Sequence, residues 1–303
     1  MLLQQAISKS EQAWEDKFKS WSVGPSKTEE ERCENAINMI KEAISSSEKL
    51  KNRDVRIFLQ GSYRNKVNVR ADSDVDVGVV CKDVFYANYP KGYNRDSFGF
   101  TKGSYTFSEF KNDVEEALVS KFGRVAVTRG NKAFDIKANS YRVEADVAPF
   151  MEHRRFSTDG SYLEGVQQFS DDGKTIINWP EQHYENGVSK NTATSRRYKR
   201  TARVLKKLKN DMVHNGYSHL DNIPGFLCEC LIWNVPNSHF NKDRFYDILR
   251  SSIGYLYHEL NKDSSDEWGE VSDLKYLFGT SQKWTKKQAQ DFLKAAWNYV
   301  GFE

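Results

Sequence analysis

Residues 59–80 read LQGSYRNKVNVRADSDVDVGVV, and aspartates alternate with valines towards the end of this stretch. Successive side chains of a β-strand point to opposite faces, so Asp72, Asp74 and Asp76 would share one face and the valines the other. Like charges at this spacing repel one another unless a cation lies between them. The pattern therefore predicts a strand with one buried face and one face that binds a metal ion.

A tight turn precedes this strand. The segment VRIFLQ (55–60) has the composition of a strand, and Gly61 and Ser62 follow it directly. Glycine allows the backbone to come close to a ligand, and Ser62 with its neighbouring amides can hold a phosphate at the start of a helix. We therefore expect a phosphate-binding turn beside the metal-binding strand.

A third carboxylate is available in YRVEADVAPF (141–150). Alternation in a strand would place Val143, Ala145 and Val147 on one face. Arg142, Glu144 and Asp146 would lie on the other face. A carboxylate from a neighbouring strand would complete three oxygen ligands for hard divalent cations. Asp72 and Glu144 are alternatives within the set, and capping of strands and turns at a solvated edge is the alternative role. Three carboxylates share one face of the predicted strands while valines fill the opposite face, and this favours a metal site over capping.

Such a set of carboxylates suits in-line phosphoryl or nucleotidyl transfer. One Mg²⁺ ion lowers the pKa of an attacking hydroxyl, and a second neutralises the triphosphate and the leaving pyrophosphate. Asp74 and Asp76 would contact both ions, and Asp146 would hold the ion at the nucleophile. Mn²⁺ is the alternative cation.

The order of these motifs resembles the polymerase-β-like nucleotidyltransferases: Gly61-Ser62, then Asp74-Val75-Asp76-Val77, then Asp146. Four phrases are similar to those of the bacterial CD-NTases, closest to their CdnE branch, over roughly residues 50–240: FLQGSYRN, DSDVDVGVV, EADVAPF and IPGFLCECLIWNVP. CD-NTases are relatives of animal cyclic GMP–AMP synthase that make cyclic oligonucleotide signals in anti-phage defence.

The resemblance implies roles for individual residues. It favours Asp74, Asp76 and Asp146 as the catalytic metal ligands and leaves Asp72 at the mouth of the site. It also implies nucleotide contacts from the turn, by Gln60, Gly61 and Ser62. Many relatives have a small or hydroxylated residue where this chain has Lys66-Val67, so no loop contact is carried over there. The zinc insertion and DNA-binding surface of the animal enzyme have no counterpart, and we expect no requirement for double-stranded DNA.

A basic segment, SRRYKRTARVLKKLK (195–209), predicts a helix with an apolar stripe opposite its basic face. The resemblance implies that a basic residue near the middle of this helix contacts the triphosphate, and Arg203 and Lys206 match best. The alternatives are a solvated helix face and nucleic-acid binding by the whole stripe.

Two further segments bear on the nucleobase. Phe226 follows Gly225 at the start of the next helix, where it is either a base platform or part of the core. The segment HYENGVSKNTATS (183–195) resembles the family's lid, in which Asn186 or Asn191 could read a base edge. Ordinary surface polarity is the alternative for both asparagines. The CdnE branch associates a lid asparagine with pyrimidines, which implies a product that contains uridine.

The helical and strand patterns predict an α+β fold with a mixed sheet, followed by a helical domain. We expect a catalytic domain with N-terminal helices over residues 1–180 and a helical nucleotide-binding domain over residues 181–303. Loops are expected over residues 82–105 and near residues 158–190.

Composition limits the other possibilities. The formal charge of +3, from 45 basic and 42 acidic residues, is too balanced for a typical electrostatic binder of nucleic acid. The four cysteines form no C-x-x-C pair, which indicates reduced, buried thiols. No apolar run approaches the roughly 20 residues that span a bilayer, and the N-terminus lacks a secretory signal, so we expect a cytoplasmic location and no membrane partner.

These observations predict a Mg²⁺-dependent nucleotidyltransferase that makes a cyclic di- or oligonucleotide from nucleoside triphosphates, with ATP and UTP as candidate substrates. The product would be read by a downstream effector. One alternative is a template-independent transferase that acts on RNA, an antibiotic or a protein. The other is a non-catalytic nucleotide-binding protein, which the complete aspartate trio disfavours.

Overall fold

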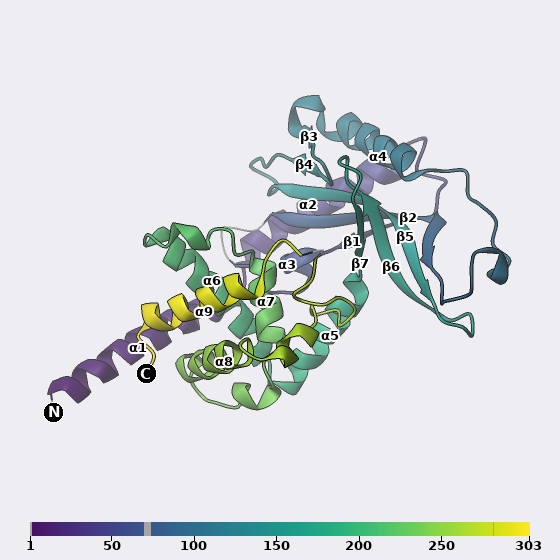
Figure 1. The fold of residues 1–303 in the computed structure, drawn as a ribbon. Helices are drawn as coiled ribbons and strands as arrows, with labels where there is room; N and C mark the ends of the chain where they lie inside the picture. The colour runs from purple at the N-terminus through teal and green to yellow at the C-terminus, as the bar shows by residue number, and fades with distance from the viewer. Residues whose placement is uncertain (1, 70–73, 281) are drawn as a thin grey trace. The chain divides into compact units, whose positions relative to one another are not determined.

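The computed structural model describes residues 2–69, 74–280 and 282–303 (Figure 1). Internal contacts divide the chain into two compact units. The sheet unit comprises Ser26–Arg64 and Ser73–Glu181, and the helical unit comprises Met1–Pro25, Asn65–Asp72 and Gln182–Glu303. Asp72, which the sequence analysis left at the mouth of the site, lies outside the described residues.

The sheet unit is built on one mixed sheet, for which the described chain supplies seven strands. The order is β1-β2-β5-β4-β3, with β6 paired to the far part of β5 and β7 paired to β6. Only β2 and β5 pair in parallel among the described strands. The strands are Val55–Leu59 (β1), Val75–Asn88 (β2), Val127–Arg129 (β3), Phe134–Ile136 (β4), Ala145–Phe156 (β5), Tyr162–Phe169 (β6) and Thr175–Asn178 (β7).

Two helices, α2 (Lys27–Ser45) and α4 (Phe107–Phe122), pack on one face of this sheet. Each begins with a capping box, in which the side chain of Ser26 or Thr106 accepts from a backbone N–H three residues later. The valines of DVDVGVV at positions 75, 77 and 79 are fully buried between the sheet and these helices. The alternation predicted from the sequence is therefore confirmed on the apolar face. The short elements of this unit are α3 (Gly61–Arg64), η1 (Asp96–Phe98) and η2 (Arg124–Ala126).

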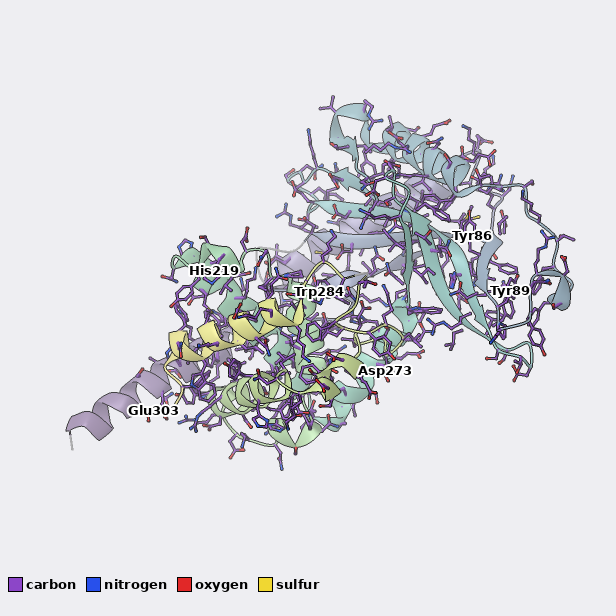
Figure 2. The ribbon with its side chains drawn as sticks, viewed as in Figure 1. Tyr86, Tyr89, His219, Asp273, Trp284 and Glu303 are labelled. Carbon is purple, nitrogen blue, oxygen red and sulfur yellow. The ribbon has the colours of Figure 1, made fainter. Side chains whose placement is uncertain are left out.

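β2 is longer than the sequence predicted, because it continues to Asn88 through an irregularity between Cys81 and Phe85. Tyr86 lies near its end and Tyr89 follows it (Figure 2). Tyr86 packs edge-on against Phe169 with 5.1 Å between ring centroids, and Tyr89 stacks on Phe156 at 5.5 Å. Aromatic pairs of this kind stabilise neighbouring strands, so the loop expected over residues 82–105 begins later than predicted.

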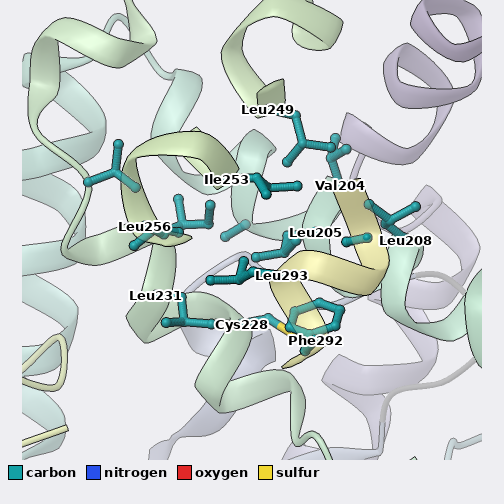
Figure 3. Packing of buried hydrophobic residues seen from close by; sticks show 14 of the residues in the cluster. Val204, Leu205, Leu208, Cys228, Leu231, Leu249, Ile253, Leu256, Phe292 and Leu293 are labelled. Carbon is teal, nitrogen blue, oxygen red and sulfur yellow. The ribbon is translucent and has the colours of Figure 1, made fainter. Parts of the chain in front are cut away.

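The helical unit is organised around α6 (Arg197–His214), whose residues contribute to a large apolar core. In this core Leu205 packs with Leu231, Ile253 and Leu293 of other helices (Figure 3). The other elements are α1 (Leu2–Ser22), α5 (Pro180–Ala193, from Gln182 on), α7 (Gly225–Trp233), α8 (Phe245–Glu259), α9 (Lys286–Val300), η3 (Ser218–Leu220), η4 (Asn237–Phe240) and η5 (Asp263–Glu267). No helix of the described chain is long and apolar enough to cross a membrane.

The prediction of a loop region near residues 158–190 is wrong, because these residues form β6, β7 and most of α5. β6 carries two adjacent buried glutamines, Gln167 and Gln168, which hide any apolar alternation. Its pairing with β5, rather than its local pattern, makes it a strand. α1 and residues 65–69 were expected in the catalytic domain over residues 1–180. By internal contacts they belong to the helical unit instead.

The cysteine prediction is confirmed. Cys33, Cys81, Cys228 and Cys230 are all free and buried.

Candidate active site

The aspartates of β2 and β5 lie in register on one face of the sheet. Asp76 is directly opposite Asp146 in the parallel pair, and both side chains are partly buried. Asp74 immediately precedes β2, and the next backbone N–H, of Val75, donates to the Glu144 carbonyl at 3.1 Å. Backbone pairing therefore holds the two strands together up to the carboxylates that the sequence predicted.

The turn that begins α3 lies against Asp76. Gly61 has a φ of 63°, in the left-handed region, and a Cβ added there would fall on Oδ2 of Asp76. The N–H of Gln60 donates to the Asp76 carbonyl at 3.0 Å. Glycine at position 61 is thus required by the approach of the turn to a carboxylate. The predicted phosphate contacts of Gln60, Gly61 and Ser62 remain predictions.

Ion pairs fix the end of the same short helix. Arg64 forms an ion pair with Glu181, and Arg56 Nη1 lies 3.1 Å from the second oxygen of that carboxylate. Arg64 Nη1 also donates to the Leu59 carbonyl at 3.4 Å. Burial opposes ionisation of Glu181, but the two guanidinium groups lower its pKa. These contacts tie the turn to β1.

Asp135 of β4 is a carboxylate that the sequence analysis did not include. It lies opposite Asp146 in the antiparallel β4–β5 pair, on the side of β5 away from β2. Burial, together with repulsion from the Asp135 and Asp74 carboxylates, raises the pKa of Asp146 to about 6. The signal was present in the sequence, because Asp135 stands between the two apolar residues Phe134 and Ile136, as Asp76 stands between valines.

The chemistry of this donor set fits a divalent cation. Carboxylate oxygens are the ligands that Mg²⁺ prefers. Burial is the main cause of the raised pKa of Asp146, and repulsion from Asp135 and Asp74 contributes to it. The described residues hold no three Asp, Glu, His or Cys side chains already gathered as a metal site. A bound cation would relieve the repulsion among these carboxylates.

In the helical unit, the guanidinium group of Arg203 donates hydrogen bonds to backbone carbonyls. Its Nε donates to the Ser22 carbonyl at 2.8 Å, and its Nη1 donates to the Lys66 carbonyl. The side chain is 8% exposed, and burial lowers its pKa to about 10. Arg203 therefore joins α1 and residues 65–69 to α6, whatever contact it makes with a nucleotide.

Lys206 is also buried and has a charged partner. Its Nζ lies 3.2 Å from Glu229 Oε2, and His183 Nε2 lies 2.9 Å from Glu229 Oε1. Burial opposes the ionisation of Glu229, but Lys206 and His183 lower its pKa to about 2. The solvated helix face, one of the alternatives for the basic segment, does not hold at Arg203 and Lys206, which are both nine-tenths buried.

Phe226 packs inside the helical unit. Its ring lies 5.8 Å from that of His183 and 6.0 Å from that of Trp284, which Figure 2 labels. It is half-buried against the main core of this unit. The structure thus shows Phe226 packed against the core. Stacking of a nucleobase on Phe226 remains a prediction.

The two candidate lid asparagines lie on α5, a helix rather than a loop. Asn186 Nδ2 donates to the Val271 carbonyl at 2.9 Å. Asn191 Oδ1 accepts from the backbone N–H of Lys199 at 3.2 Å, at the start of α6. One half of each amide therefore has a structural hydrogen bond, and base reading would have to use the other half.

Comparisons with known proteins define the class. Residues 37–155 match the family model of the nucleotidyltransferase domain. Residues 185–301 match that of the cGAS/DncV-like nucleotidyltransferase C-terminal helical domain. The predicted α+β nucleotidyltransferase core with a mixed sheet and a C-terminal helical domain is confirmed, and the protein is a nucleotidyltransferase.

Relatives narrow this class to one branch. The chain is 47% identical to the cyclic dipyrimidine nucleotide synthase CdnE of Cecembia lonarensis and 44% identical to that of Legionella pneumophila, over 95% of this chain and 98% of each relative. It is also similar to the structure of Elizabethkingia meningoseptica CdnE cyclic dinucleotide synthase with GTP and Apcpp, with a TM-score of 0.80, 38% identity and coverage of 95% of this chain and 99% of that one. For the Rhodothermus marinus CdnE c-UMP-AMP synthase with Apcpp and Upnpp, the TM-score is 0.84 at 30% identity, with 95% and 97% covered. The chain belongs to the CdnE branch of the CD-NTase family and is a cyclic dinucleotide synthase.

Proposed function

We propose that this protein joins two pyrimidine nucleoside triphosphates, with UTP as a substrate, into a cyclic dipyrimidine in a Mg²⁺-dependent reaction. The observation that carries the proposal is the identity of 47% and 44% to two cyclic dipyrimidine nucleotide synthases. The relative named as a cyclic dipurine nucleotide synthase is 38% identical. The uridine-containing product expected from the sequence points in the same direction.

Two successive transfers form the ring. In the first, a ribose hydroxyl of one nucleotide loses its proton to solvent and attacks the α-phosphorus of the other, whose bond to pyrophosphate breaks. The linear dinucleotide keeps one triphosphate, and its free hydroxyl attacks that α-phosphorus in the second transfer, which releases a second pyrophosphate. Bound Mg²⁺ supplies neutralisation of the triphosphate charge and a lower pKa for the attacking hydroxyl.

The chain's own residues orient these groups. Asp74, Asp76 and Asp146 would hold two Mg²⁺ ions, or Mn²⁺ ions in their place, on the carboxylate face of β2 and β5. Gly61 keeps the α3 turn against Asp76, so phosphates bound by Ser62 would lie beside the carboxylates. In-line transfer depends on this kind of positioning, since most of its catalysis is electrostatic and geometric.

The product is proposed to act as an anti-phage signal that a downstream effector reads in the cytoplasm. The resemblance to bacterial CD-NTases supports this role. It also supports activity without double-stranded DNA.

The test is product analysis. The protein is incubated with the four nucleoside triphosphates, Mg²⁺ and no acceptor, and phosphatase-resistant material is identified by mass spectrometry. A cyclic product of two pyrimidines is expected. A cyclic dipurine would overturn the base assignment, and turnover unchanged by chelation of divalent ions would overturn the metal dependence.

A further inference from the structure

β1 is an edge strand of the sheet, and among the described strands it pairs only with β2. The N–H of Gln60 donates to the Asp76 carbonyl at 3.0 Å, and the N–H of Lys82 donates to the Asp54 carbonyl at 2.8 Å. In an antiparallel pair, residues that bond to the partner strand alternate with residues whose backbone groups point away from it. The even-numbered residues from 54 to 60 therefore bond to β2.

The backbone groups of Val55, Ile57 and Leu59 point the other way, to the free edge. The Leu59 carbonyl accepts from Arg64 Nη1 at 3.4 Å. The N–H and C=O of Ile57 have no such partner among the residues that the structure describes. β1 carries neither a proline nor a bulge, which are two of the features that protect an edge from pairing with another strand. The edge is thus open to a further strand, with Ile57 at its centre.

An open pocket adjoins this edge and lies within the sheet unit. It is formed by α2 on one side and β1 on the other. Its lining consists of Glu34, Ile37, Asn38, Lys41, Ile57, Phe58 and Leu59. The strand supplies apolar side chains, whereas the helix supplies one acidic and one basic side chain.

The two charges on α2 are arranged symmetrically about the middle of the pocket. Glu34 and Lys41 are exposed, and they are about two helical turns apart on one face. Neither forms an ion pair with any residue in the described part of the chain. Ile37 and Asn38 lie midway between them. A second α2 rotated by a two-fold axis through this midpoint would place its lysine opposite Glu34 and its glutamate opposite Lys41.

The same axis suits β1. α2 runs antiparallel to β1, since the Tyr63 hydroxyl, beyond the end of β1, donates to the Glu30 carbonyl near the start of α2 at 3.4 Å. Glu34 therefore lies toward the end of β1 and Lys41 toward its start. If β1 pairs antiparallel with a second β1 about Ile57, the two Ile57 residues can exchange both N–H···O bonds. Strand pairing and charge pairing then require one and the same two-fold rotation.

We propose that this surface, the free edge of β1 with the adjoining face of α2, binds a second copy of this chain in a two-fold dimer. A two-fold interface uses the same surface on both copies and must be complementary to itself. The opposite charges of Glu34 and Lys41, placed symmetrically about the pocket, meet this requirement. β1 leads directly into the Gly61 turn, so the pairing would also restrain the strand that positions this turn.

The experiment uses charge reversal in the full-length protein, with sedimentation velocity from about 1 to about 200 μM protein. The variants are Glu34→Lys and Lys41→Glu, each alone and the two mixed in equal amounts. The matched control is Glu42→Lys on the same helix, because Glu42 pairs with Lys121 of α4 at 2.6 Å and does not line the pocket. Circular dichroism checks that the variants fold, as expected at exposed positions.

The wild type is expected to dimerise as its concentration rises. Each single reversal should weaken the dimer by about tenfold, because both ion pairs across the axis become repulsive, whereas Glu42→Lys should leave it unchanged. The mixture should form a heterodimer, since one copy then carries two lysines and the other two glutamates at the facing positions. Hydrogen exchange of residues 55–59 should slow on dimerisation.

Three results would overturn the proposal. A wild type that stays monomeric at the highest concentration would leave the edge to an extended segment of another protein. A dimer that neither single reversal weakens would use a different surface. Failure of the mixed variants to associate, while the wild type dimerises, would exclude the two-fold pairing of Glu34 with Lys41.

Discussion

Asp135 and Asp146 face each other across the β4–β5 pair, and Asp146 faces Asp76 across the β5–β2 pair. Three adjacent strands thus each contribute an aspartate to one row. Like charges directly opposite one another on a sheet destabilise it.

Asp135→Asn is expected to stabilise the metal-free protein, by about 0.2–1 kcal/mol, because one member of a repulsive pair loses its charge. The measurement is denaturant unfolding in the presence of a chelator. The matched control is Asp96→Asn, at an exposed position on η1. A decrease in stability would show that Asp135 supports the strand pair instead of repelling Asp146.

The double substitution Asp74→Asn with Asp76→Asn is expected to leave the fold intact and to abolish product formation. Both carboxylates would be lost as metal ligands, while the amides keep the same shape. Circular dichroism checks the fold, and labelled nucleoside triphosphates check turnover. Appreciable turnover by this variant would reject Asp74 and Asp76 as the ligands of the catalytic ions.

Gly61→Ala is expected to reduce activity far more than its cost in stability implies. Two effects coincide at this position: a left-handed backbone, at a φ of 63°, and a collision of the new Cβ with Asp76 Oδ2. The matched control is Gly99→Ala, because Gly99 has a φ of 72° with no neighbouring atom within 4 Å of its added Cβ. Both variants should lose about 1–2 kcal/mol of stability from the backbone alone. Equal loss of activity in both would show that contact with Asp76 is unimportant.

The Glu229 carboxylate predicts how stability depends on pH. Its pKa is lowered from 4.5 to about 2, which corresponds to about 3 kcal/mol. Because the folded-state pKa is the lower one, this contribution is present above pH 4.5 and is lost as the pH falls towards about 2.

Glu229→Gln should therefore destabilise the protein by about 3–5 kcal/mol at pH 7, where Lys206 loses its buried partner, and by less at pH 3. Urea unfolding at both pH values measures the difference. A difference that is the same at pH 3 and pH 7 would contradict the ionised pair.

The sequence predicted those parts of the molecule that depend on local pattern. α4 spans the predicted residues 107–122, and the alternation of DVDVGVV placed its valines in the core. The pairing of Asp76 with Asp146 followed from two such patterns, because a shared apolar face fixes which residues are turned away from it.

What the sequence did not predict depends on partners far away in the chain. Arg203 donates to carbonyls 181 and 137 residues away, at Ser22 and Lys66, and nothing in the basic helix reveals these acceptors. β6 likewise becomes a strand through β5. Asp135 could have been found, since its apolar neighbours match the pattern used for the other aspartates.

The parallel pairing of β2 with β5 has a consequence for how this enzyme can diversify. Neighbouring strands lie about 4.8 Å apart whatever side chains they carry, so the distance between the backbones that bear Asp76 and Asp146 is set by main-chain hydrogen bonds. Paired catalytic metal ions need a comparable separation, about 3.5–4 Å. If Asn186, Asn191 or Phe226 of the helical unit reads the base as predicted, substitutions there would change base preference and leave this backbone-defined separation the same. The strand spacing that the two metal ions need would then be independent of which base the enzyme accepts.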